Sequence, residues 1–436
     1  MLPSCLRLLR DADSSKIFAR ANISRFAGVQ IRSSSHLWAV FLGVMFVNSS
    51  LWACPFCSGP TQTLAERYAD SEVILVAKGV PESTAPGAKR EASGRYEIIS
   101  VLRDKSGQYK VGGTLTHDRT ALPGTRTMFL GMVSKSESGK SESAWNELVD
   151  VNETVLKYIR EAPGPKQSDR LKYFERFLEH PELTIANDAY GEFANSKYEE
   201  IQPIARQMSP AKLRAWIENP KTPTMRFGLL GMLLGLCGSN ADASILEKWV
   251  LEKEDKPTSG VDGMTYGYLL IRGEIGLDKL EREVLHNPTV SVGVISDRMI
   301  AIRCMWTYGD ERVARERLCL TYHPLLKRPE LAGTAVIDLA RWKDWRVQDE
   351  VVALYGRPAF TRPREQMTIV KYLLESAKDI PEGATEIPEH AAGALQHLEC
   401  LRQSDPILFA PPGKIPLKTV SLGFHGKRTP WLPLRR

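Results

Sequence analysis

The sequence lacks the short motifs by which several large enzyme classes are recognised. It contains no Gly-x-Ser-x-Gly elbow, no phosphate-binding P-loop and no Gly-x-Gly-x-x-Gly fingerprint, which argues against the enzymes built on them. It also lacks His-Glu-x-x-His and a second Cys-x-x-Cys pair, so common zinc sites are not expected. The residue directly after Cys57 is serine and not histidine, so c-type haem attachment is not expected either. These absences favour a protein without enzymatic activity, cofactor or bound metal.

Positive charge is scarce in the middle of the chain, although the whole sequence has a formal charge of +6. The first 53 residues carry six basic and two acidic residues, and residues 411–436 carry six basic residues and no acidic one. The part between them is therefore slightly acidic. A nucleic-acid-binding protein would need a basic stripe on folded structure, so no nucleic-acid partner is expected.

Long apolar runs are also missing, and the uncharged run at residues 37–47 would reach only about 16 Å as a helix, roughly half of a bilayer core. Arginines precede this run and Ala53 stands before Cys54, which is typical of a signal peptide cleaved before Cys54. Residues 1–53 are therefore predicted to be a leader that exports the chain to the periplasm or the medium. Two alternatives stay open, namely an uncleaved membrane anchor that runs through Ala53 and acylation of Cys54, since residues 51–54 approximate a lipobox.

Residues 54–160 are predicted to form a small β-rich domain with one leading helix. Thr63 and Glu66 have the spacing of a capping box, which predicts a short helix after Thr63. Four apolar or alternating segments have the composition of strands, namely residues 73–77, 96–102, 114–117 and 127–133. The low-complexity stretch 134–143 is expected to be a mobile loop. Four strands at this spacing predict a small barrel or sandwich.

Beyond residue 163 the apolar period becomes that of helices, so residues 166–405 are predicted to be a helical domain. Ser209 and Pro210 begin one of these helices, and Asn219 ends it. Connections of similar composition, each leading into a new helix, recur faintly about every 35 residues. Their marker positions are Gly238, Gly276, Gly309 and Asp344. This pattern resembles a short HEAT-type solenoid, and an irregular helical bundle is the alternative.

Residues 406–436 are basic and rich in proline. Such a tail is either extended along the helices or disordered. The apolar side chains of Phe424, Trp431 and Leu432 indicate that some of it docks.

The motif Cys54-Pro55-Phe56-Cys57 resembles the redox motif of glutaredoxins, which would imply a thiol–disulfide protein that uses Cys54 and Cys57. A thioredoxin-type site needs a strand directly before the first cysteine, where this chain has its leader, and it needs a cis-proline loop, which the chain lacks. The alternative is a local disulfide, or two thiols, that tie down the mature N-terminus.

A second resemblance covers residues 54–135. This part of the chain is similar to the OB-fold domain of the netrin and TIMP families. The similarity lies in the order of its elements: a cysteine at the cleavage site, a helix, the strand that follows residues 68–72, and a Tyr96-Glu97-Ile98 strand. The resemblance implies an OB-like barrel. In the metalloprotease inhibitors of this kind the amine and carbonyl of the first cysteine chelate the target's zinc, a role that only Cys54 could take. The chain departs from that pattern in having Cys-x-x-Cys and no later cysteines in the domain.

Several other residues are weaker candidates. Asp188 and Glu192 stand four apart on one helix and could form a catalytic carboxylate pair, although we expect a solvated face. His390, His397 and Cys400 share one helical face, where a surface helix with a buried cysteine is favoured over a metal site. The remaining interpretations concern packing: Trp342 and Trp345 between helices, and Cys237, Cys304, Cys319 and Cys400 as small buried hydrophobes.

The whole arrangement resembles an uncharacterised family of exported bacterial proteins with a Cys-Pro-Phe-Cys start, and this resemblance implies no activity. The sequence therefore predicts a multidomain α+β protein, with an OB-like barrel followed by a HEAT-like solenoid or bundle. We expect a non-enzymatic interaction or scaffold protein of the bacterial cell envelope, with a protein partner and possible membrane association through the leader or a lipidated Cys54.

Overall fold

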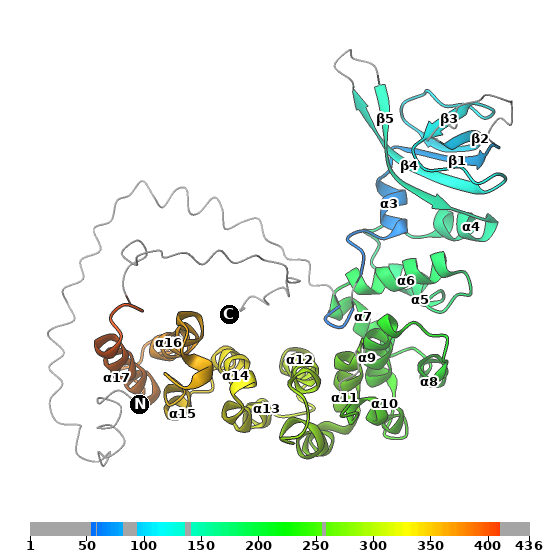
Figure 1. Cartoon of the computed structure of the whole chain (residues 1–436). Coiled ribbons are helices and arrows are strands. Elements are labelled where there is room, and N and C mark those ends of the chain that lie inside the picture. Colours follow the sequence, from blue (N-terminus) through cyan, green and yellow to red (C-terminus); the bar gives the residue numbers. More distant parts are fainter. Residues whose placement is uncertain (1–53, 58, 82–93, 136–140, 255–258, 410–436) are drawn as a thin grey trace, which may run out of the picture. The chain divides into compact units, whose positions relative to one another are not determined.

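The computed structural model describes residues 54–57, 59–81, 94–135, 141–254 and 259–409. They form a mixed α+β protein in which a five-stranded antiparallel sheet precedes a helical region (Figure 1). They divide into two compact units, the first of residues 54–246 and 259–267, the second of residues 247–254 and 268–409. Residues 1–53, which were predicted to be a leader, and the residues beyond 409 lie outside the described residues.

The first unit begins with the sheet and its two flanking helices. In chain order these are α3 (Leu64–Asp70), β1 (Val73–Gly79), β2 (Gly94–Asp104), β3 (Thr114–His117), β4 (Arg126–Lys135), β5 (Ser141–Asp150) and α4 (Glu153–Glu161). Its later helices are α5 (Arg170–Glu175), α6 (Leu183–Asn195), α7 (Tyr198–Ala205), α8 (Pro210–Glu218), α9 (Phe227–Cys237) and α10 (Ala243–Val250), whose last residues pass into the second unit.

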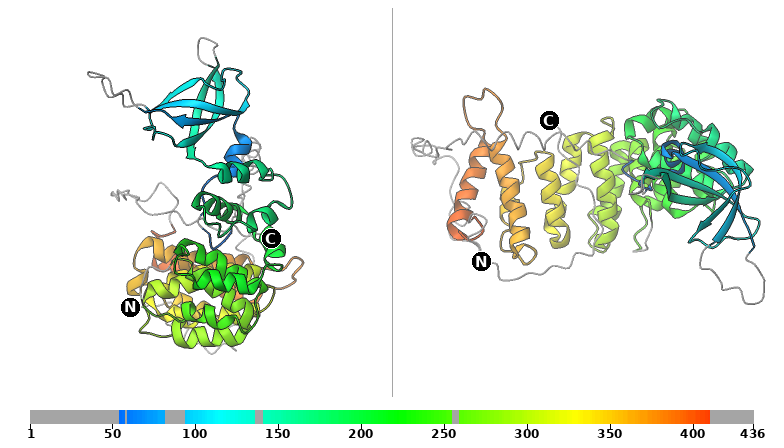
Figure 2. Two further views of the ribbon diagram at one scale, coloured as in Figure 1. Left: turned by 90° about the vertical axis from the view of Figure 1, so that its right-hand side faces the viewer. Right: turned by 90° about the horizontal axis from the view of Figure 1, so that it is seen from above.

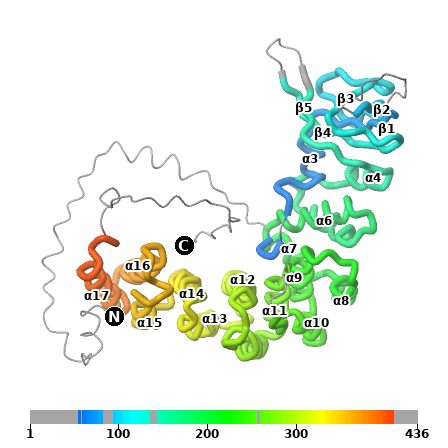
Figure 3. Tube along the Cα trace, viewed as in Figure 1, coloured from blue at the N-terminus to red at the C-terminus, as the bar shows by residue number. Residues whose placement is uncertain are grey.

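Helix α11 (Val261–Leu280) begins in the first unit and ends in the second. The second unit continues with α12 (Val292–Tyr308), α13 (Arg315–Tyr322), α14 (Pro329–Arg341), α15 (Gln348–Val352), α16 (Pro363–Lys378) and α17 (Glu389–Ser404). Helices α12, α14 and α16 pack side by side and α17 packs on α16, whereas α13 and α15 lie along one flank of this row (Figures 2 and 3).

The sheet is curled into a half-barrel with the strand order β3-β2-β1-β4-β5, and every pair is antiparallel. All four predicted strand segments are confirmed, as β1 to β4. Strand β1 is central, and burial on both of its faces explains its unbroken apolar run. Register shifts in the β1–β2 and β4–β5 pairs add local twist, which helps the sheet to curl.

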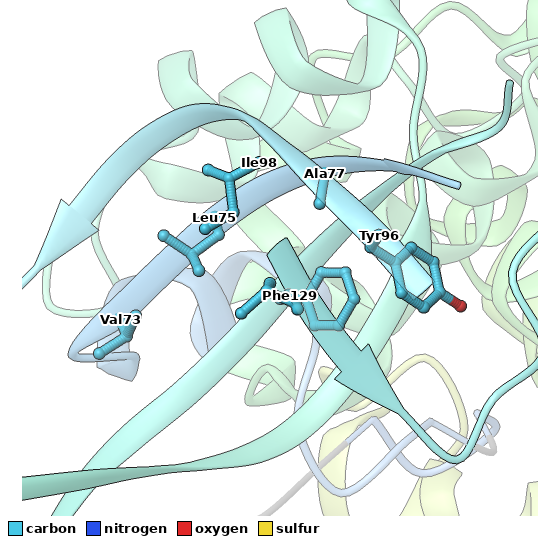
Figure 4. Close-up of a cluster of buried hydrophobic side chains, with 7 residues drawn as sticks. Val73, Leu75, Ala77, Tyr96, Ile98 and Phe129 are labelled. Carbon is cyan, nitrogen blue, oxygen red and sulfur yellow. The ribbon is translucent and has the colours of Figure 1, made fainter. Parts of the chain in front are cut away.

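One face of the sheet holds a compact apolar core (Figure 4). Its buried members are Val73, Leu75, Ala77, Tyr96, Ile98, Leu115 and Phe129. The rings of Tyr96 and Phe129 meet edge to face with centroids 5.0 Å apart, an arrangement that aromatic quadrupoles favour. The Tyr96 hydroxyl donates to the carbonyl of Arg119 at 3.1 Å, so its polar end is satisfied.

The prediction of a loop over residues 134–143 is wrong at both of its ends. Strand β4 continues to Lys135 and β5 begins at Ser141, with Lys135 opposite Ser141 in the register. Serine and glutamate are poor strand formers, but pairing with β4 supplies the hydrogen-bonding partners that local composition does not reveal. Residues 136–140 lie outside the described residues.

In the helical region most of the predicted boundaries are confirmed. Ser209 caps α8, Gly238 ends α9 and Gly309 ends α12. The prediction that a helix ends at Gly276 is wrong, because this residue lies inside α11. The break in that helix is instead at Gly273, whose φ of 56° and ψ of −138° suit glycine.

Helices α9 and α11 approach each other along two glycine rows in the first unit. Gly228, Gly231 and Gly235 face Gly263 and Gly267, and a Cβ on Gly267 would overlap the carbonyl oxygen of Gly231. A side chain on Gly231 would come within 2.7 Å of the Met264 amide nitrogen. The two backbones can pack this closely only because these positions carry no Cβ.

Candidate functional site

The Cys54-Pro55-Phe56-Cys57 segment is held against the helices of the first unit. Cys54 and Cys57 form a disulfide with their Cα atoms 5.4 Å apart, which confirms the prediction of a local bridge. Cys54 is only 4% exposed, and its amide donates to the carbonyl of Ala194 at 3.0 Å. Phe56 is also buried, with its ring centroid 4.9 Å from that of Tyr266. The segment is therefore part of the folded core.

These contacts bear on both functional interpretations of Cys54. The first helix after the bridge along the chain begins at Leu64, so the bridge does not itself open a helix, as the cysteine pair of a thioredoxin-type site would. A zinc-chelating N-terminus would need the nitrogen and carbonyl oxygen of Cys54. Here the Cys54 nitrogen donates a hydrogen bond to the Ala194 carbonyl, and the Cys54 carbonyl oxygen accepts one from the Cys57 amide at 3.3 Å. The geometry favours a structural role.

Helix α3 begins at Leu64, seven residues after Cys57, where it forms a buried junction with α6. The Thr63 hydroxyl accepts from the Glu66 amide and the Glu66 side chain accepts from the Thr63 amide, so the predicted capping box is confirmed. Asp188 on α6 accepts from the Leu64 amide at 2.5 Å and from the Tyr158 hydroxyl at 2.8 Å. The carboxylate thus binds the positive end of α3.

Glu192, one turn further along α6, completes the junction. It accepts from the Thr63 hydroxyl at 2.5 Å and forms an ion pair with Arg170 of α5. We call Asp188 and Glu192 the carboxylate clamp. The sequence-based expectation of a solvated face is wrong, because Asp188 is 5% and Glu192 0% exposed. Both residues face the α3 N-terminus, whose unpaired amides need acceptors when they are buried.

Burial dominates the electrostatics of the clamp. It raises the pKa of Glu192 to about 7, against the opposing effects of Thr63 and Arg170. It also raises the pKa of Asp188, although the Tyr158 hydroxyl and the Leu64 amide act in the other direction. Because these carboxyl groups already bind a helix start, a tyrosine and an arginine, the arrangement suits a structural junction better than catalysis.

The second unit contains a groove of about 800 Å³. We call it the aromatic groove. Its lining residues come from α12, α13, α15, α17 and the connection after α14: Trp306, Glu316, Cys319, Trp342, Lys343, Asp344, Trp345, Arg346, Gln348, Asp349, Glu389, His390, Gly393 and His397. Residues from five segments therefore converge on one surface.

Stacked rings form the apolar part of the aromatic groove. The indoles of Trp306 and Trp342 are parallel to within 17°, with centroids 4.8 Å apart, and Trp345 lies parallel to the His390 ring at 6.2 Å. Trp345 also donates to Asp379 at 2.7 Å. The predicted interhelix packing of Trp342 and Trp345 is confirmed, and both rings line the groove as well.

Asp344, a buried acidic residue, also lines the groove. Burial alone would raise its pKa, but contacts at 2.7 Å from His323 and Arg346 hold the pKa well below its usual range. Cys319 lies on the same side of α13 as His323, which is similar in residue types to a cysteine–histidine–aspartate site. Burial, however, raises the pKa of the Cys319 thiol to about 12, so the thiol stays protonated and is a poor nucleophile.

The remaining sequence candidates have partners within the protein. The ring of His390 contacts the carbonyl of Asp379 at 2.9 Å, and His397 contacts Asp349 at 3.1 Å. Cys400 is buried, as are Cys304 and Cys319, whereas Cys237 is only half-buried. Among the residues that the structure describes, no cluster of three histidine, cysteine or acidic side chains is placed to hold a metal ion.

In the described ranges, no helix combines the length and the apolar character that crossing a membrane requires. No family model, no curated protein and no solved structure matches the chain.

No local pattern indicated the aromatic groove, because Trp306 contacts Trp342 only through the packing of α12 against α14. For the carboxylate clamp a signal was present. The neighbours of Asp188 and Glu192 on α6 are Ala189, Tyr190, Gly191 and Phe193. A helix that is apolar on nearly every side is buried, so its carboxylates are buried too.

Proposed function

We propose that the chain is an exported, non-enzymatic interaction protein of the bacterial cell envelope that binds an extended segment of a partner protein in the aromatic groove. The observation that carries this proposal is the groove itself, with its stacked indoles and fixed charges. Tryptophan and arginine are the residues that most often dominate binding energy at protein interfaces. An exposed carboxylate at the groove wall, that of Asp349, can accept hydrogen bonds from a peptide.

The order of helices in the second unit supports a finer interpretation. Helices α12, α14 and α16 make one row, and the groove is lined mainly by the alternate helices α13, α15 and α17. Two alternating rows with a binding surface on one of them are typical of HEAT-type solenoids. In the same way, the pairing of β4 with β1 after the β1-β2-β3 meander supports an OB-like sheet. Both likenesses are analogies of fold.

The bridge between Cys54 and Cys57 supports export, since disulfides persist mainly in oxidising compartments. The two rival functions of this segment are less well supported. A thiol–disulfide protein needs an accessible, reactive sulfur, whereas Cys54 is buried and the bridge does not open a helix of its own. An inhibitor of the zinc-chelating kind needs the backbone atoms of Cys54 that already bind Ala194 and Cys57.

The test is a selection of random extended peptides on the chain from Cys54 onward, followed by affinity measurements on variants. Trp306→Ala removes one groove ring, and Trp216→Ala is a matched control. Each indole is half-buried and lies under a cation, Arg315 at 5.3 Å and Lys212 at 4.8 Å respectively, but Trp216 does not line the groove.

We expect Trp306→Ala to weaken the selected peptides about 30-fold, as for a tryptophan hot spot, and Trp216→Ala to leave the affinity unchanged. Circular dichroism of both variants checks that the helices are retained. Equal losses of peptide affinity in the two variants would show that the aromatic groove is not the binding site. Peptide affinities that neither substitution changes would show the same.

A further inference from the structure

The rim of the aromatic groove is acidic. Four acidic residues line it, Glu316, Asp344, Asp349 and Glu389, against two basic residues, Lys343 and Arg346. Asp344 is paired with Arg346, but the side chain of Asp349 is 90% exposed and Glu389 is also exposed. A segment that fits this surface would carry basic residues for the rim and an aromatic ring for the indoles.

Such a segment exists in the same chain. Residues 411–436 contain six basic residues and no acidic one, and Phe424 and Trp431 lie among them. Lys427 and Arg428 stand between these two rings in the sequence. The tail therefore combines the charge and the ring chemistry that the groove presents.

The tail is also long enough. The last described residue, Phe409, lies just beyond the end of α17 at Ser404. The groove residues of α17 run from Glu389 to His397, so a chain that leaves α17 at Ser404 returns to them over at most roughly 24 Å, the length of this helix. About eight extended residues cover that distance, which allows Phe424 to Trp431 to reach the groove.

We propose that residues 410–436 occupy the aromatic groove of their own chain and compete there with the partner segment. The inference rests on the proposed function of the groove as a peptide site. The tail would then regulate that function, because a partner binds only when it displaces the tail. The apparent affinity for the partner equals the intrinsic affinity multiplied by the fraction of chains in which the groove is open.

Cross-linking in the chain from Cys54 to Arg436 tests the occupancy. A photoreactive phenylalanine analogue replaces Trp431, and mass spectrometry maps the residues that it labels. We expect labels on residues 306, 342–349 and 389–397. Asp349→Lys should reduce this labelling several-fold, whereas Glu350→Lys should not, because Glu350 is its exposed neighbour on α15 and does not line the groove.

A mixture of isotope-labelled and unlabelled chains separates the possible occupants. Cross-links within one isotope class support the proposal. Cross-links between the classes at the same residues would overturn it in favour of a second copy of the chain. Labels confined to other surfaces would overturn it outright.

Competition gives a second readout that keeps the two proposals apart. The double variant Lys427→Glu and Arg428→Glu should bind the groove-selected peptides about tenfold more tightly, if the tail fills nine grooves in ten. Unchanged affinity for peptides that still depend on Trp306 would overturn the tail proposal and leave the proposed function intact. If no peptide depends on Trp306, both proposals fail.

Discussion

Thr63 donates a hydrogen bond to Glu192, a residue 129 positions further along the chain, with 2.5 Å between the hydroxyl and carboxylate oxygens. This bond joins the start of the helix that leads into the sheet to a helix beyond it. Together with the Asp188 contacts, it explains why the sheet and helices α5 to α9 belong to one compact unit. The carboxylate clamp thus holds together parts that the sequence presents as separate domains.

Replacement of Glu192 should change how stability depends on pH. Its pKa is about 7 in the folded chain, above its ordinary value of 4.5, so the folded state binds the proton more tightly. The resulting stabilisation is complete below pH 4.5 and is lost as the pH rises through 7. Relative to Glu192→Gln, the wild-type protein should therefore lose about 3 kcal/mol of unfolding free energy between pH 4.5 and pH 8.

Urea unfolding of both proteins across this pH range measures the difference. Glu199→Gln, at an exposed position on α7, is the matched control and should run parallel to the wild type. A constant difference between the wild type and Glu192→Gln at every pH would contradict the assignment of a raised pKa to this carboxyl group.

Asp188 and Tyr158 should differ in how much stability they contribute. Asp188→Ala leaves the Leu64 amide and the Tyr158 hydroxyl buried without their acceptor, so we expect a loss of about 3 kcal/mol. Tyr158→Phe removes one donor and leaves the α3 contact in place, at a cost of about 1.5 kcal/mol. Hydrogen exchange of residues 64–70 separates the two, because only Asp188→Ala should expose the amides at the start of α3.

The elements that were predicted correctly are those determined by residues close together in the sequence. The capping box at Thr63 and Glu66 spans four residues, and β1 is recognisable because burial of both faces leaves an apolar run. The burial of Asp188 was not predicted, because its cause is a helix start 124 residues earlier. Strand β5 and the aromatic groove were missed for the same reason, since each depends on a partner that only the tertiary fold supplies.

The bridge between Cys54 and Cys57 should stabilise the chain without taking part in groove binding. Cys57→Ser opens a loop of four residues, for which chain entropy gives a loss of about 2 kcal/mol. The affinity for groove-selected peptides should stay the same. Cys237→Ser, at a half-buried free cysteine, is the control and should change stability less. A loss of peptide affinity in Cys57→Ser alone would instead connect the bridge to function.

The closest approach of α9 and α11 predicts opposite effects of two glycine substitutions. Gly267→Ala places a methyl group against the Gly231 carbonyl, and since backbone on both sides must move, we expect a loss of about 3 kcal/mol or more. Gly333→Ala on α14 meets no atom within 4 Å and should gain about 0.5–1 kcal/mol, because alanine favours the helix. Thermal unfolding measures both. Equal effects of the two substitutions would mean that the helices can separate at Gly267 without cost, in conflict with the packing of α9 against α11.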